Sequence, residues 1–285
     1  MRRMITRITA LTDPSTGNPA WIAEGDDDRP LGTARVHIPA GGGAADLRIT
    51  VHPAERRAGA GTRLLAAAVA SASERGLTAL LGPAVEEGSA GESFCVAAGM
   101  RRVLALTYTR LELASFAGAA GPVDGYRIVH WEGTVADELA ETFARSRRAM
   151  DDMPMDDAAW TPDTWDVQRL HRIAEAVAKR GEILLTTAVI GPDAEIAGFT
   201  EVVVAGDGTG DGQHYGTGVL PEHRGRGLAR WLKVAQIEEI RARFPGLAGL
   251  LADTADSNVA MRRINDSLGY LPTHRSLLYQ ADLPR

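Results

Sequence analysis

The second half of the chain alternates between apolar residues at helical spacing and short apolar runs. Helical spacing predicts one helix that begins at Thr134 and another that runs from Gly225 to Phe244. A capping residue, a proline and an early acid favour a further helix start at residues 161–163, and a last helix is predicted over residues 258–268. The short runs predict strands over residues 126–131, 182–190, 195–205, 213–220, 247–252 and 276–283, the last as a closing strand.

Two motifs recur in the same order in the two halves of the chain. The segment from Val51 to Gly61 reads V-x-P-x-x-R-x-x-G-x-G, and the segment from Val219 to Ala229 reads V-x-P-x-x-R-x-x-G-x-A. Each is followed, at a nearly equal distance, by a segment that ends in a glycine, at Gly99 and at Gly269. Two motifs that repeat in register predict two copies of one domain.

The repeat predicts a first domain over residues 1–118 and a second over residues 126–285. A small, glycine-rich segment between them has the composition of a linker. The first copy reaches its strands at residues 20–24 and 32–38 almost directly, so it has no room for the two helices that open the second copy. We therefore predict a reduced first domain that is structural or binds cofactor, and a catalytic second domain.

The composition is that of an ordinary globular protein and narrows the function classes. The chain has 285 residues, of which 45% are hydrophobic and 24% are charged. A formal net charge of −6 argues against a general nucleic-acid-binding protein, and a single cysteine excludes a disulfide scaffold. The sequence shows no apolar run of membrane-spanning length and no secretory signal core, so we expect a cytoplasmic protein with no membrane partner. We also expect the protein to be a monomer or a homodimer. The histidine spacing predicts no metal site.

A strand that runs into a glycine-rich turn and then into a helix is a typical anion site. The first N–H groups of a helix lack backbone partners, and the helix dipole makes this end positive. Gly225, Gly227 and Ala229 leave the backbone accessible to a diphosphate, with Arg224 and Arg226 close by in the sequence. The turn contains neither G-K-[S/T] nor G-x-G-x-x-G, which argues against a nucleoside-triphosphate loop and a dinucleotide fold.

These features resemble the GNAT superfamily of acyl-CoA-dependent N-acyltransferases. The family signature [Q/R]-x-x-G-x-[G/A] is matched at Arg56–Gly61 and Arg224–Ala229, and its later helix motif at Asn258–Tyr270 and more weakly at Phe94–Met100. The doubled match resembles tandem GNAT proteins of the kind that includes mycothiol synthase. The resemblance implies an α/β fold (α+β layered) of two tandem domains, each with a mixed, mostly antiparallel central sheet flanked by helices. It also implies acetyl-CoA (coenzyme A) as co-substrate, without a metal.

The resemblance further implies which residues hold acetyl-CoA, with its pyrophosphate on the amides of the second glycine-rich turn. In the second copy they are Val219, Leu220, Arg224, Gly225, Arg226, Gly227, Leu228, Ala229, Arg230 and Asn258. In the first copy the matching residues are Val51, Arg56, Arg57, Ala58, Gly59, Ala60 and Gly61.

Catalysis in the family needs a base for the ammonium of the acceptor, and both copies depart from the family pattern. The usual carboxylate is replaced by Gln213 in the second copy and by Ala45 in the first. The usual tyrosine acid is replaced by Asn265 and Cys95. The catalytic roles are therefore expected to fall on other residues.

Period-2 alternation places Gln213, Tyr215, Thr217 and Val219 on one face of their strand, as a polar row that leads to the turn. We predict that Glu201, on the neighbouring strand, is the base, acting directly or through a water held by Tyr215 and Thr217, with Gln213 beside them. A functional role would explain why a carboxylate lies in a mostly apolar strand, where burying it unpaired costs free energy or raises its pKa. A pairing with an arginine, or a place at the sheet edge, would instead make Glu201 structural.

Further candidates are the aspartates of residues 151–157, which could attract a cationic acceptor, and His214 and His223, either of which could relay a proton. Alternation predicts that His214 points away from the Gln213 face. The resemblance implies an N-acetyltransferase in which the primary amine of a small molecule attacks acetyl-CoA directly in a ternary complex. The alternatives are a protein acetyltransferase acting on lysine or an N-terminus, and a catalytically silent acyl-CoA-binding sensor or scaffold.

Overall fold

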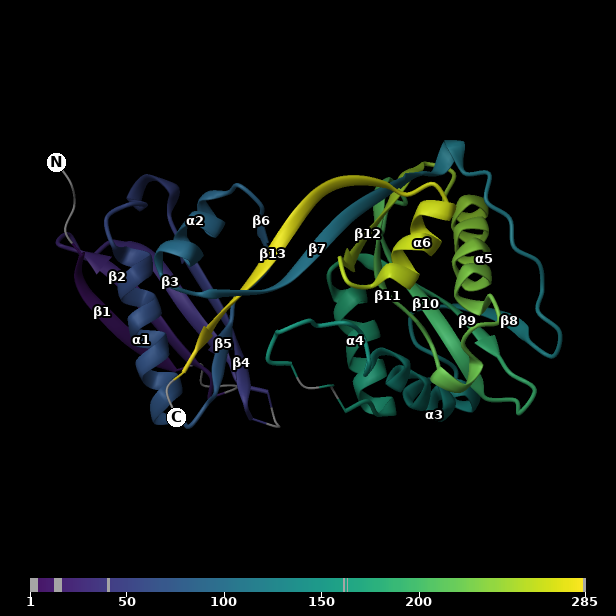
Figure 1. Cartoon of the computed structure of the whole chain (residues 1–285), viewed down its shortest axis with the longest axis horizontal. Coiled ribbons are helices and arrows are strands. Elements are labelled where there is room, and N and C mark those ends of the chain that lie inside the picture. Colours follow the sequence, from purple (N-terminus) through teal and green to yellow (C-terminus); the bar gives the residue numbers. More distant parts are fainter. Residues whose placement is uncertain (1–4, 13–16, 40–41, 161, 163, 284–285) are drawn as a thin grey trace. The chain divides into compact units, whose positions relative to one another are not determined.

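The computed structural model describes residues 5–12, 17–39, 42–160, 162 and 164–283. The chain forms two compact units (Figure 1). Unit 1 comprises Met1–Leu106, Met155–Thr161 and Arg275–Arg285, and unit 2 comprises Thr107–Pro154 and Pro162–His274. Unit 1 therefore includes segments from both ends of the chain.

The sheet of unit 1 has the order β1 (Ile5–Thr12), β2 (Pro19–Gly25), β3 (Pro30–His37), β4 (Ala44–Val51) and β5 (Ala79–Leu81). The neighbours from β1 to β4 are antiparallel, whereas β4 and β5 are parallel. Helix α1 (Ala60–Glu74) joins the parallel pair and buries Leu64 and Ala68 in a core with Trp21. In the described part of the chain no helix precedes β2, which confirms a first copy without the early helices.

The last strand of the chain completes unit 1. Strand β13 (Leu271–Asp282) pairs antiparallel with β5 at Gln280 and with the short β6 (Val85–Glu86) at Ser276. Helix α2 (Ala90–Ala97) precedes β7 (Arg101–Glu112). The assignment of residues 276–283 as the closing strand of the second copy is therefore wrong, because they pair with strands that precede the second copy in sequence. The two contiguous domain ranges stay a prediction.

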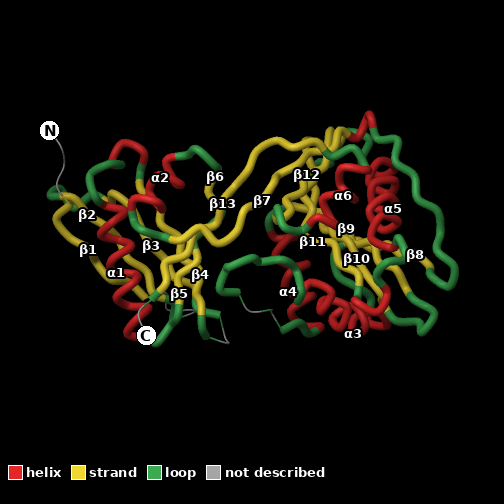
Figure 2. Tube along the Cα trace, viewed as in Figure 1, coloured by secondary structure: helices red, strands yellow, loops and turns green. Residues whose placement is uncertain are grey.

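The sheet of unit 2 has the order β7, β12 (Leu247–Ala255), β11 (Gly210–Val219), β10 (Ile196–Ala205), β9 (Glu182–Ile190) and β8 (Arg127–Glu132). The neighbours from β8 to β11 are antiparallel, whereas β11 and β12 are parallel. This is the mixed, mostly antiparallel sheet that the resemblance implies. Figure 2 shows its strands in yellow and the helices of the same unit in red.

Helices cover the two faces of this sheet. Helix α5 (Leu228–Arg243) packs against one face, in a core that includes Val202 of β10. Helices α3 (Asp137–Ser146) and α4 (Val167–Lys179) pack against the other face, in cores that include Phe199 and Val203 of β10. Because side chains alternate along a strand, Glu201 shares the face of α3 and α4, and Thr200 shares the face of α5.

Three helices of unit 2 begin later than the sequence predicts. Helix α5 begins at Leu228 rather than at Gly225. Helix α3 follows Ala136 rather than Thr134, and no side chain caps it. Helix α4 begins after Asp166, whose carboxylate accepts a hydrogen bond from the backbone N–H of Arg169 at 2.6 Å. The predicted start of α4 at residues 161–163 rests on Thr161 and Asp163, which lie outside the described residues.

Candidate active site of unit 2

Strands β11 and β12 separate before β11 ends. Their parallel ladder runs from the pair Gly210 and Leu247 to the pair Gln213 and Leu251. Strand β11 continues to Val219 and stays paired with β10 on its other side. Residues 214–219 of β11, all of which are described, therefore have no strand partner on the side that faces β12. The resemblance places acetyl-CoA in a splay of this kind.

The free edge leads into the glycine-rich turn. Gly225 and Gly227 have φ angles of +74° and +83°, a left-handed conformation that other residues rarely adopt. A Cβ atom at either position would meet no protein atom within 4 Å, so both glycines border open space. Gly227 is the N-cap of α5, no side chain caps this helix, and its first turn carries no acid. The backbone N–H groups of this turn therefore fit a diphosphate.

The signature arginine fastens the turn to the end of the preceding strand. Nε of Arg224 donates to the carbonyl oxygen of Val219 at 2.8 Å, and Nη1 donates to Oδ2 of Asp152 at 2.5 Å. The guanidinium lowers the pKa of Asp152 through this hydrogen bond. In the first copy, Nε of Arg56 donates in the same way to the carbonyl oxygen of Val51 at 3.4 Å.

The other two arginines near the turn differ in their hydrogen-bond partners. Arg230 donates to Oγ of Ser267 and to the carbonyl oxygen of Ala119. Arg226 is exposed and has no hydrogen bond or ion pair with another described residue. Arg226 is therefore the side chain of the turn that is most available to an anionic ligand.

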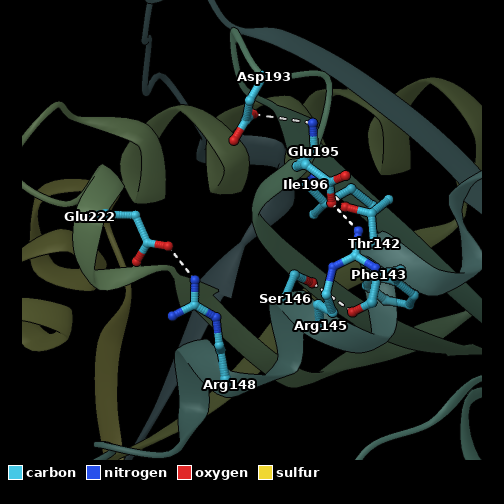
Figure 3. A network of polar contacts seen from close by, with 9 residues as sticks. All are labelled: Thr142, Phe143, Arg145, Ser146, Arg148, Asp193, Glu195, Ile196 and Glu222. Carbon is cyan, nitrogen blue, oxygen red and sulfur yellow. Dashed lines mark hydrogen bonds and ion pairs between the residues drawn. The ribbon is translucent and has the colours of Figure 1, made fainter.

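A polar network holds the end of α3 beside this turn (Figure 3). Arg148, just after α3, pairs with Glu222, which lies in the short helical turn before the glycines. Arg145 pairs with Glu195, and Oγ1 of Thr142 accepts a hydrogen bond of 2.7 Å from the first backbone N–H of β10. The network ties one helix to both the start of β10 and the approach to the turn.

A β-bulge changes the side-chain pattern of β11. Glu201 of β10 pairs with Gly216, but the next residue, Val202, pairs with His214. Tyr215 is therefore an extra residue in β11, and the alternation of side chains shifts there.

The bulge divides the predicted polar row between the two faces of the sheet. On the face of α3 and α4, the hydroxyl of Tyr215 accepts a hydrogen bond of 2.7 Å from Arg180, which follows α4. On the face of α5, Oγ1 of Thr217 lies 2.7 Å from Oγ1 of Thr200, and Val219 packs in a core with α5. The single row of Gln213, Tyr215, Thr217 and Val219 is therefore wrong, and Tyr215 and Thr217 cannot hold one water together.

Glu201 is buried and paired with an arginine. Its Oε1 accepts a hydrogen bond of 2.6 Å from Nη2 of Arg147, and both side chains are about 95% buried. Oγ1 of Thr186 lies 3.4 Å from the same oxygen. This pairing with an arginine is the geometry that the structural alternative for Glu201 requires. The role of Glu201 as a base stays a prediction.

His214 lies on the face of α5, opposite to Gln213, as alternation predicts. Its Nε2 lies 2.7 Å from the hydroxyl of Tyr270 and 3.4 Å from Nζ of Lys233. Burial lowers the pKa of Lys233 to about 7, and burial beside Lys233 lowers the pKa of His214 well below its ordinary value. His214 therefore favours its neutral form near neutral pH, whereas Lys233 is divided between its charged and neutral forms there. His223 instead bonds to the hydroxyl of Tyr126.

The two asparagines of the later helix motif have local partners. Oδ1 of Asn258 caps α6 (Val259–Ser267) by accepting from the backbone N–H of Met261 at 3.2 Å. Asn265 is buried and donates to Oγ1 of Thr254 at 3.2 Å. The predicted contact of Asn258 with acetyl-CoA stays a prediction.

The acidic segment after α3 does not form one patch. Asp152 is paired with Arg224, and Asp156 and Asp157 belong to unit 1, where the backbone N–H of Asp157 donates to Val103. Of the charge expected to attract a cationic acceptor, that of Asp152 thus has a local partner in Arg224.

Sequence reasoning missed Asp253, which follows the point where β11 and β12 separate. Its Oδ1 lies 3.5 Å from Nε2 of Gln213. The side chain is exposed, yet neighbouring protein atoms remove part of its hydration and raise the pKa of its carboxyl group. The sequence does contain one signal for this residue, because Asp253 is an acid that directly follows the apolar run of residues 247–252.

The glycine-rich turn of unit 1 repeats the backbone of the second turn. Gly59 caps α1 with φ of +89°, and Arg57, at the position of Gly225, has φ of +65°. The strand that leads to this turn carries Ala45 and Leu47, which are buried in the core of unit 1. Unit 1 thus combines the turn with an apolar strand face, as the sequence predicts.

The described residues contain neither a membrane-spanning helix nor a cluster of metal ligands. No described helix has both the length and the apolar character needed to cross a membrane. Across residues 5–283, wherever the structure is described, no three His, Cys, Asp or Glu side chains gather as a metal site would need.

The model of the Acetyltransferase (GNAT) family matches residues 4–90 and 147–270 of the chain, and so covers both glycine-rich turns. The chain belongs to the GNAT family. It is therefore an acetyl-CoA-dependent acyltransferase, and the resemblance seen in the sequence is confirmed.

Relatives and solved structures extend this match over nearly the whole chain. The mycothiol acetyltransferase of Nocardia farcinica is 28% identical over 96% of this chain and 86% of its own. That of Clavibacter sepedonicus is 30% identical over 82% of this chain and 72% of its own. A tandem GNAT protein from the clavulanic acid biosynthesis pathway has a TM-score of 0.73 at 24% identity, covering 96% of this chain and 86% of its own. The tandem GNAT fold is thus confirmed.

Proposed function

We propose that unit 2 transfers the acetyl group of acetyl-CoA to a primary amine of a small molecule, by direct attack of the amine in a ternary complex. One observation carries the proposal. The unpaired edge of β11 runs directly into an open, uncapped helix N-terminus, and this pair of features suits an elongated ligand that ends in a diphosphate.

The residues of the turn have distinct roles in this proposal. The backbone N–H groups from Gly225 to Arg230 bind the diphosphate, and Arg226 adds a cation. Arg224 acts indirectly, because its bonds to Val219 and Asp152 hold the turn against the strand. When bound, acetyl-CoA supplies the acetyl group as a thioester, and the free edge of β11 offers backbone groups along its length.

The comparisons support a small molecule as the acceptor. Two relatives at 28% and 30% identity are named mycothiol acetyltransferases, and they match this chain across both copies. No protein substrate is named among these relatives.

The decisive experiment measures release of the coenzyme A thiol from acetyl-CoA in the presence of single amines. An aminoglycoside, a polyamine, free amino acids and a lysine-containing peptide form a suitable panel. We expect turnover with a small amine and none with the peptide. Turnover with the peptide alone would favour the protein acetyltransferase, and acetyl-CoA binding without turnover would favour the sensor.

A further inference from the structure

We propose that Asp253 is the group that takes the proton from the attacking ammonium, with Gln213 orienting its carboxylate. This inference rests on the proposed function, because it concerns an amine acceptor at the same site. It assigns the base to β12, although the family pattern expects a carboxylate at Gln213 on β11.

The position of Asp253 follows from the separation of the two strands. The last ladder pair is Gln213 with Leu251, and Asp253 is the next residue of β12 whose side chain points to the same face as that of Leu251. The 3.5 Å approach of Nε2 of Gln213 to Oδ1 of Asp253 shows that the two side chains meet there. Asp253 thus puts a carboxylate beside the position where the family pattern expects one.

Asp253 differs from other carboxylates on this face in having no cationic partner. Glu201 is held by Arg147 at 2.6 Å, and Asp211 is held by Arg110 at 2.8 Å. In each of these pairs the carboxylate is already engaged by a guanidinium. Among the described residues, Asp253 has a side-chain contact with the neutral amide of Gln213 and no ion pair.

The surroundings of Asp253 also favour proton acceptance. Loss of hydration raises the pKa of Asp253. On β7, burial and the charge of Asp253 raise the pKa of Tyr108, whose ring stacks on His274 at 4.3 Å. Further along the same face, Arg110 pairs with both Asp211 and Glu112. Asp253 is exposed, so an acceptor can reach it.

The reaction balances with this assignment. The ammonium of the acceptor gives one proton to the Asp253 carboxylate and becomes a neutral amine. The amine lone pair forms the C–N bond to the thioester carbonyl carbon, and the C–S bond breaks with its electron pair on sulfur. The remaining excess proton on nitrogen passes to the thiolate, which leaves as the thiol, and Asp253 releases its proton to water.

The test compares Asp253→Asn with the wild-type protein, using the best small amine of the panel. We expect kcat at neutral pH to fall by about 10²–10⁴-fold, with acetyl-CoA affinity measured by calorimetry unchanged. The loss should shrink at high pH, because free amine then accumulates without a base. Asp253→Glu should recover part of the activity.

A matched control is Asp211→Asn, because it makes the same chemical change on the same sheet face at a carboxylate that an arginine already holds. We expect this variant to keep its kcat. A second readout is independent of turnover: the carboxyl carbon of Asp253, followed by NMR in the protein alone, should titrate above the ordinary range for aspartate.

The outcomes separate this inference from the proposed function. Wild-type activity with a small amine, combined with an unchanged kcat and pH profile in Asp253→Asn, overturns the role of Asp253 and leaves the function standing. A wild-type protein that binds acetyl-CoA but acetylates no amine overturns both. Equal losses in Asp253→Asn and Asp211→Asn would show a general effect of charge and also overturn the assignment.

Discussion

Nη2 of Arg147 donates a hydrogen bond to Oε1 of Glu201 across 2.6 Å inside an aromatic core. The guanidinium lies 4.4 to 4.6 Å from the ring centres of Phe143, Trp165 and Phe199. Nε of Arg147 is buried without a hydrogen-bond partner among the described residues. Glu201 is thus the counter-charge on which this buried cation depends.

Replacing Glu201 with glutamine should therefore reduce stability more than catalysis. The variant leaves the charge of Arg147 buried without a counter-ion, and we expect the free energy of unfolding to fall by about 3–5 kcal/mol. Urea denaturation measures the loss. The double variant Glu201→Gln, Arg147→Met removes the unpaired charge and should recover most of the stability. A kcat loss of about 10²–10⁴-fold in folded Glu201→Gln would instead restore Glu201 as the base.

The sequence was sufficient to flag Glu201 but not to find its partner. A carboxylate in an apolar strand is visible in the sequence, because burial of a charge needs compensation. Arg147 lies on a different element, and no local pattern relates the two residues. The repeat and the two turns were predictable, since each depends on local spacing of glycines, arginines and apolar residues. The sheet type followed only from the family resemblance that these motifs carry.

The polar row of β11 could not be predicted because alternation assumes a regular strand. One extra residue at the bulge moves every later side chain to the other face, so Thr217 separates from Gln213. Glycines inside a strand are a signal of such irregularity, and β11 contains Gly216 and Gly218. The place of β13 was equally hidden, because its pairing with β5 joins residues far apart in the sequence.

Lys233 should make unit 2 more stable at alkaline pH. Burial lowers its pKa from 10.5 to about 7 in the folded protein, where it faces His214 and Tyr270 and, among the described residues, has no ion pair with a carboxylate. Below pH 7 Lys233 is charged in the folded protein, and burial of this charge lowers the free energy of unfolding. In the unfolded chain Lys233 keeps its proton up to about pH 10.5. The unfolded state thus binds more protons between these values, and stability rises with pH.

The slope from this group can reach about 1.4 kcal/mol per pH unit between pH 7 and 10. Urea denaturation at several pH values measures it, and Lys233→Met, which cannot titrate, is the control. We expect the variant to be more stable than wild type at pH 7 and to lack this alkaline rise. Equal slopes for the two proteins would show that Lys233 does not titrate as described.

Gly227→Val should separate the roles of the two glycine-rich turns. A Cβ atom at Gly227 would border open space, so a larger side chain there would extend into the region in which a diphosphate approaches the backbone. Its left-handed backbone also strains the variant, and Gly59→Val is the matched control because φ is +83° at Gly227 and +89° at Gly59. Similar melting temperatures for the two variants would show that the strain is matched.

With stability matched in this way, we expect kcat/KM for acetyl-CoA to fall by at least about tenfold in Gly227→Val, the equivalent of 1.4 kcal/mol. Gly59→Val should keep most of its turnover, because the strand that leads to its turn presents Ala45 and Leu47 to an apolar core. Steady-state kinetics at varied acetyl-CoA concentration decide the matter. A loss confined to Gly59→Val would move the catalytic site to unit 1.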